Sequence, residues 1–77
     1  MSNFEKWITN KMGHRPRNID LANQLGEQRG ELVRKWMAGE TYPDLKNCSR
    51  LAVLLKMKLA DVRKQILGVQ IEDVDEQ

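Results

Sequence analysis

The sequence predicts an all-α fold of five short helices in one compact domain. Apolar residues recur at spacings of three and four along most of the chain, which is the period of one helical face. Glycine or proline stands at most places where this pattern breaks. No segment alternates strictly enough to require a strand, apart from Val69, Ile71 and Val74 near the C-terminus. The 77 residues, 40% of them hydrophobic, hold one core and leave no room for a second lobe.

The first helix is expected between Asn3 and Met12, with Ser2 or Asn3 as its cap. Its apolar face consists of Phe4, Trp7, Ile8 and Met12. Gly13 is expected to end this helix, since glycine readily adopts the left-handed conformation of a helix C-terminus. A basic loop follows, and its Pro16 disfavours helical continuation.

The second and third helices are separated by a glycine turn. Asn18 is expected to cap the second helix, and Gly26 to end it. The predicted buried face of the second helix consists of Ile19, Ala22 and Leu25, with Leu21 beside them. The third helix has one apolar face formed by Leu32, Val33 and Trp36. Gly39 and Pro43 then break the pattern.

The fourth helix is predicted to be the longest and most apolar, and Asp44 stands at its N-cap position. Its apolar positions are Leu45, Cys48, Leu51, Ala52 and Leu55. The last pattern, Leu59, Val62 and Ile66, is expected to end at Gly68. We therefore expect a domain over residues 1–68 and an acidic tail or linker over residues 69–77. This tail either adds a short dimerisation strand, through Val69 and Ile71, or begins a linker to a second domain.

Charge is unevenly distributed along the chain. Residues 1–68 hold all thirteen basic residues and seven of the eleven acidic ones, a net charge of +6. A basic body suits a polyanionic partner, although a solvated charged surface explains the same composition.

Composition argues against enzymatic, metal-binding and membrane functions. His14 is the only histidine and Cys48 the only cysteine, so the sequence offers no nucleophile–base pair, metal-ligand set or internal disulfide. We therefore expect no catalytic activity and no cofactor. No apolar run approaches the roughly 18 residues of a membrane span, so a cytoplasmic protein is expected.

The order of these features from Asn18 to Val62 matches a known pattern. Its elements are Leu21-Ala22, Leu25-Gly26, Trp36 with Gly39, Tyr42-Pro43, and then Leu45, Leu51-Ala52, Leu55, Leu59 and Val62. This run resembles the lambda-repressor-like, Cro/cI-type helix-turn-helix family. The resemblance implies a five-helix lambda-repressor-like domain with a helix-turn-helix at about residues 18–37, whose second helix enters the DNA major groove. Nine residues separate Gly26 from Trp36, one more than is usual in the family, so we expect a longer turn.

Base-contacting residues are predicted at the start and on the outer side of the third helix. Because Val33 and Trp36 face the core, helical geometry directs Glu31, Arg34 and Lys35 outward. Arg34 can pair with guanine, and Glu31 either accepts from a cytosine amino group or orients a basic neighbour. The predicted groove contacts are Gln28, Arg29, Glu31, Arg34 and Lys35. Gly30 indicates either close approach to DNA or a flexible helix start.

Phosphate contacts are predicted on the two flanks of this helix. The candidates are Arg15, Arg17, Asn18, Thr41, Tyr42, Lys46 and Asn47. Trp7 and Trp36 are expected in the core, since both lie on apolar faces.

Two functions follow as hypotheses. The first is a sequence-specific regulator of transcription, a repressor of phage, prophage or plasmid type, that binds double-stranded DNA as a homodimer on a pseudo-palindromic operator. It would act at the nucleoid of a bacterial or phage-infected cell. The second is a protein-interaction module, antitoxin-like or an anti-repressor adaptor, with a protein partner. Glu27, Glu31 and Glu40 favour the second hypothesis because each repels phosphate.

Overall fold

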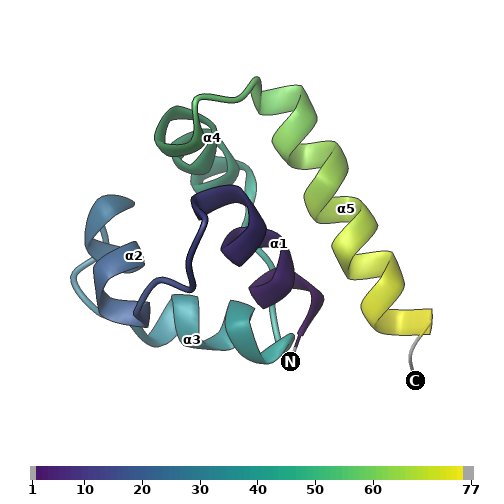
Figure 1. Cartoon of the computed structure of the whole chain (residues 1–77), viewed down its shortest axis with the longest axis horizontal. Coiled ribbons are helices and arrows are strands. Elements are labelled where there is room, and N and C mark those ends of the chain that lie inside the picture. Colours follow the sequence, from purple (N-terminus) through teal and green to yellow (C-terminus); the bar gives the residue numbers. More distant parts are fainter. Residues whose placement is uncertain (1, 76–77) are drawn as a thin grey trace.

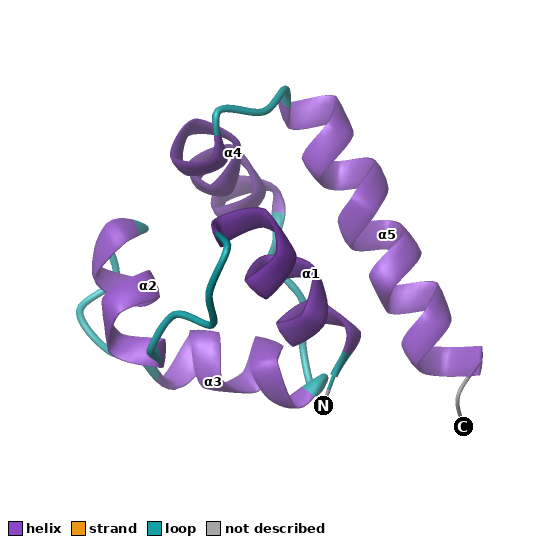
Figure 2. Cartoon of the chain, in the orientation of Figure 1, coloured by secondary structure: helices purple, strands orange, loops and turns teal. Residues whose placement is uncertain are grey.

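Five helices contain most of the residues that the computed structural model describes, which are residues 2–75, with side chains through Glu72 (Figure 1). The helices are α1 (Asn3–Met12), α2 (Asn18–Gln24), α3 (Glu31–Ala38), α4 (Leu45–Leu55) and α5 (Leu59–Asp75). Within residues 2–75 there is no strand, as Figure 2 shows, so the predicted all-α fold is confirmed. α1 packs against α3 and α5, α2 packs against α3, and α4 packs against α5.

Three helix ends follow the predicted chemistry, both ends of α1 and the start of α4. The Ser2 hydroxyl accepts a hydrogen bond from the Glu5 amide at 3.1 Å and caps α1. The Asp44 carboxylate accepts from the Asn47 amide at 2.9 Å and caps α4. Gly13, with φ of 80°, ends α1 in the left-handed conformation. The predicted N-cap of α2 is wrong. Arg17 occupies the N-cap position, and Asn18 is the first helical residue.

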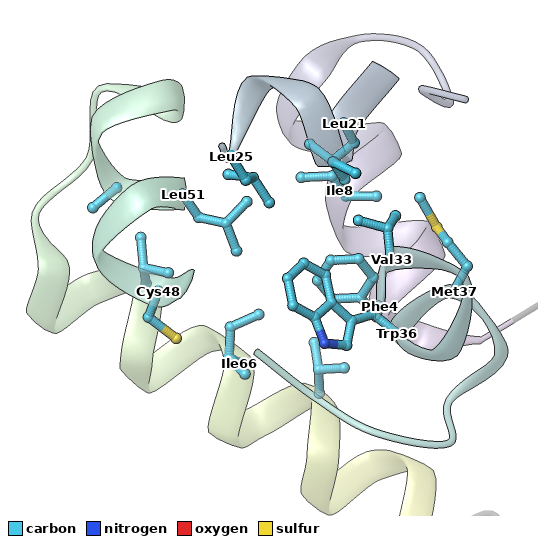
Figure 3. Close-up of a cluster of buried hydrophobic side chains, with 14 residues drawn as sticks. Phe4, Ile8, Leu21, Leu25, Val33, Trp36, Met37, Cys48, Leu51 and Ile66 are labelled. Carbon is cyan, nitrogen blue, oxygen red and sulfur yellow. The ribbon is translucent and has the colours of Figure 1, made fainter. Parts of the chain in front are cut away.

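The core is built from one face of every helix (Figure 3). Trp36 is fully buried, and its ring meets that of Phe4 in an edge-to-face arrangement with centroids 5.6 Å apart. Two expected core residues are exposed instead. Ile19 is 41% exposed and Leu45 is 56% exposed, because α2 and α4 turn their Leu21 and Cys48 sides inward.

α5 extends beyond the end predicted for it. The helix continues through Gly68 to Asp75, so neither the predicted stop at Gly68 nor the predicted strand through Val69 and Ile71 occurs. Val69 is buried and continues the helical face that begins with Val62 and Ile66. A mid-helix glycine costs about 1 kcal/mol relative to alanine, and burial of a valine side chain offsets that cost. Val74 lies outside the described side chains.

Candidate nucleic-acid interface

α2 and α3 are joined by a connector of residues 25–30 that turns at Gly26. Gly26 has a φ of 82°, a left-handed conformation that side-chain-bearing residues rarely adopt. The Glu27 amide donates to the Ala22 carbonyl at 2.9 Å, which closes the end of α2. Ala22 is fully buried, so this hydrogen bond ties the turn to a residue of the core.

The beginnings of α2 and α3 meet at Gly30. A Cβ placed on Gly30 would lie 3.2 Å from the Ile19 backbone nitrogen and 3.3 Å from the Asn18 carbonyl carbon. This contact explains the glycine by close approach to the chain's own backbone. It also brings the first residues of both helices to one edge of the domain.

The predicted groove residues come together along this edge and the outer side of α3. Gln28, Arg29, Glu31 and Arg34 are exposed, and Lys35 is half-buried. Between the connector and α3 lies a shallow hollow, lined by Gly26, Glu27, Gln28, Arg29, Glu31, Leu32 and Lys35. Glu31 is exposed on α3 and also lines the hollow, so the hollow adjoins the exposed side of α3, and the two together form the candidate surface.

Arg34 lies between two carboxylates on this surface. Its guanidinium donates two hydrogen bonds to Glu31, from Nη2 at 2.9 Å and from Nε at 3.1 Å, and its Nη2 is also 3.3 Å from Glu40. The hydrogen bonds from Arg34, followed by its positive charge, lower the pKa of the Glu31 carboxyl below its ordinary value. Arg34 is thus oriented, but its charge is balanced in the unbound protein.

The arginines before α2 are paired in the same way. Arg17 forms a bidentate ion pair with Asp20, with Nε 2.8 Å from Oδ2 and Nη2 3.2 Å from Oδ1. Arg15 forms an ion pair with Glu5. The hydrogen bonds from Arg17 lower the pKa of Asp20. Arg15 and Arg17 are both exposed and line one hollow with Asp20. A phosphate at this hollow would compete with the carboxylates for the guanidinium groups.

The remaining phosphate candidates are placed differently. Thr41 and Lys46 are exposed, and the Tyr42 hydroxyl donates to the Gly39 carbonyl at 3.4 Å. Asn18 is half-buried, with an Oδ1 that has no hydrogen-bond partner among the described residues. Asn47 is only 3% exposed, so the structure argues against its predicted phosphate contact.

Two charged residues of this surface are not among the predicted groove and phosphate contacts. Arg50, on α4, lies 3.4 Å from the Glu27 carboxylate, and its guanidinium lies over Gly26. Glu40 follows the end of α3 and reaches back to Arg34. Both pairs join residues that are more than one helical turn apart in sequence, so helical spacing offers no signal for them.

The charge of this surface is balanced overall. Residues 17–41 contain four basic and four acidic residues, so the positive excess of the domain lies elsewhere. Within residues 42–67 there are six basic and two acidic residues.

The described part of the chain offers neither a membrane-spanning helix nor a metal-ligand cluster. No helix there is long and apolar enough to cross a membrane. Residues 2–75 also bring together no group of three or more potential metal-ligating His, Cys, Asp or Glu side chains. Compared with known proteins, the chain matches no family model, no curated protein and no solved structure.

Proposed function

We propose that this chain is a sequence-specific regulator of transcription that binds double-stranded DNA, of the lambda-repressor-like, Cro/cI type. In this proposal α2 and α3 form a helix-turn-helix, with α3 in the major groove and α2 across the phosphate backbone. Two copies bind a pseudo-palindromic operator of a phage, prophage or plasmid and repress by occluding a promoter. The site of action is the nucleoid of a bacterial or phage-infected cell.

The observation that carries the proposal is the close contact between the beginnings of α2 and α3 at Gly30. The first turn of a helix has backbone N–H groups without partners inside the helix, and these groups favour an anion at the start of α3. Gln28 and Arg29 are exposed beside them. Side chains that read bases from a recognition helix come from its N-terminal part, which is where these residues lie.

The ion pair between Arg34 and Glu31 suggests separate roles for the two residues. A guanidinium held in plane by a carboxylate is prepared for two hydrogen bonds to guanine O6 and N7. Glu31 therefore serves to orient Arg34 in this proposal. Lys35 is half-buried beside the connector, and in this proposal its long apolar stem lets the ammonium group reach the DNA groove.

Phosphate contacts are assigned to exposed and half-buried residues on either side of α3. They are Arg15, Arg17, Asn18, Thr41, Tyr42 and Lys46. Arg15 and Arg17 exchange their carboxylate partners for phosphate on binding, which limits the net gain in affinity from each.

A competition titration tests the proposal. Labelled DNA from directly upstream of the chain's own coding sequence is bound at about 0.15 M salt, where non-specific contacts are weak. Unlabelled target should displace the protein at far lower concentrations than DNA of random sequence. Equal displacement by both would exclude specific recognition.

A second candidate function is a protein-interaction module, and the balanced charge of residues 17–41 favours it. Glu31 and Glu40 lie beside Arg34 and would repel a phosphate that approached it. Retention on heparin at roughly 0.2 M salt supports the DNA-binding function. Co-purification with one protein partner, without retention on heparin, supports the alternative.

A further inference from the structure

A groove lies between α1 and α5, and none of its lining residues belongs to the candidate nucleic-acid interface (Figure 1). Its volume is about 530 Å³. Sites for small molecules typically have volumes of about 300–1,000 Å³. The groove is therefore large enough for a ligand of one or two rings.

Trp7 forms one wall of this groove. The residue is half-buried, and its indole Nε1 donates to Gln65 Oε1 at 2.8 Å, across the two helices. The ring of Phe4 packs against the indole with centroids 5.8 Å apart. The indole is thus held in place without a ligand, and an aromatic wall in a groove offers a surface on which another ring can stack.

Gly68 leaves the α5 side of the groove open. It lies in a helix interior, where glycine is less favourable than every residue except proline. A Cβ built on Gly68 would meet nothing within 4 Å, and its φ is not among the positive ones, so neither packing nor backbone conformation requires glycine here. The missing side chain instead keeps space free in the groove that Trp7 also lines.

The α1 side of the groove is cationic. Lys6 and Lys11 are exposed lining residues, and neither forms an ion pair with a carboxylate in the described part of the chain. Glu72 also lines the groove. Because α1 and α5 run in opposite directions, Glu72 lies beside the beginning of α1 and Lys11 lies toward the other end (Figure 1). A negative charge on a ligand is therefore favoured at the Lys11 end.

We propose that the groove between α1 and α5 binds a small planar aromatic anion. The ring stacks on the Trp7 indole in the space that Gly68 leaves, and Lys6 and Lys11 donate charge-assisted hydrogen bonds to the anionic group. A carboxylate and a phosphate monoester share this chemistry. Ligand binding is measured without DNA and does not rest on the proposed function.

Titration of the ¹⁵N-labelled full chain tests the proposal with two probes, 4-hydroxybenzoate and adenosine 5′-monophosphate. The chain contains two tryptophans, so its spectrum holds two indole N–H signals, which Trp7→Phe assigns. The Trp7 signal should shift with a dissociation constant below about 1 mM, and the signal of the fully buried Trp36 should stay in place. The tighter probe identifies carboxylate or phosphate as the preferred anion. No shift of the Trp7 signal with either probe up to about 10 mM would overturn the proposal.

Gly68→Leu tests the position of the ring. Its side chain should fill the groove and raise the dissociation constant of the tighter probe at least about tenfold. The control is Gln70→Leu, which adds the same side chain at an exposed position of α5 outside this groove. Urea denaturation establishes that both variants fold. Equal affinity of the two folded variants would overturn the proposal, since the ring would then lie elsewhere.

Charge removal tests the role of the lysines and keeps Gly68 in place. Lys6→Gln/Lys11→Gln should weaken binding of the anionic probe about tenfold and leave the affinity for its neutral analogue, 4-hydroxybenzamide or adenosine, unchanged. Lys58→Gln/Lys64→Gln removes the same charge at exposed positions outside the groove and should have less than about a twofold effect. Equal weakening by both double variants would show general attraction to a basic protein and would overturn the site.

Discussion

Gly30 lies so close to Ile19 that a side chain at position 30 would have to displace the backbone of α2 by a few tenths of an ångström. A Cβ there would lie 3.2 Å from the Ile19 nitrogen, closer than nine in ten real Cβ contacts. Because the neighbouring atoms belong to the backbone of α2, relief requires movement of a helix rather than of a side chain. The relative position of α2 and α3 therefore depends on this glycine.

Gly30→Ala is expected to lower the free energy of unfolding by about 1–2 kcal/mol, through overpacking against α2. The control is Gly68→Ala, where an added Cβ meets nothing within 4 Å. That substitution should raise the free energy of unfolding by about 0.5–1 kcal/mol, since alanine is favoured in a helix interior. Urea denaturation of both variants measures the effect. Equal free energies of unfolding for the two variants would show that the contact between α2 and α3 accommodates a side chain at position 30.

Arg34 and Arg17 are expected to affect DNA binding in different ways. Arg34→Ala should reduce discrimination between the target and single-base variants at one position by about 1–3 kcal/mol. Arg17→Ala should weaken binding to all sequences alike and reduce the slope of log affinity against log salt by about one. Anisotropy titrations over several salt concentrations and a panel of target variants separate the two effects. A uniform loss for both variants would contradict the assignment of Arg34 to a base.

Glu40→Gln is expected to strengthen DNA binding. The substitution removes one of the two carboxylates beside Arg34 and keeps the Glu31 pair that orients it. Affinity for any duplex should rise roughly threefold at low salt, with unchanged base preference. Asp61→Asn changes the net charge equally at an exposed position on α5 and should have a smaller effect. Weaker binding by Glu40→Gln would instead indicate that Glu40 orients Arg34.

The ion pairs predict how stability depends on pH. Hydrogen bonds from arginine lower the folded-state pKa of Glu31 and of Asp20 below their ordinary values of 4.5 and 3.8. Both pairs therefore stabilise the fold fully above these values, and the stabilisation is lost as pH falls through the lowered pKa values. Urea denaturation should show a smaller loss of stability below pH 4.5 in the Glu31→Gln/Asp20→Asn variant than in the wild type. If the variant and the wild type lost the same stability as the pH falls, the two ion pairs would not contribute to the stability of the fold.

Much of the fold could be predicted because its helices begin and end with local chemistry. Ser2 and Asp44 cap their helices through side-chain bonds to amides three residues later, which sequence spacing reveals. The end of α5 was not predictable from Gly68, because the same residue type ends a helix or is tolerated inside it. Burial of Val69 decides between these outcomes, and burial depends on tertiary packing.

Part of the ion pairing at the candidate surface was predictable from the sequence, and part of it was not. Glu31 and Arg34 are three positions apart on one helix, so their pairing follows from helical geometry. The Arg50–Glu27 contact joins α4 to the connector, and only the packing of the helices brings these residues together. The same is true of Gly30, whose neighbour Ile19 belongs to a different helix.

Selection of bound sequences from a random pool of duplex DNA tests the central claim, that the α2–α3 surface reads DNA sequence. Repeated rounds at about 0.15 M salt should converge on one motif, bound at least about a thousandfold more tightly than a scrambled duplex. The Arg34→Ala variant should select a motif with one position relaxed. A pool that stays random after selection, with equal affinity for all its members, would contradict the claim.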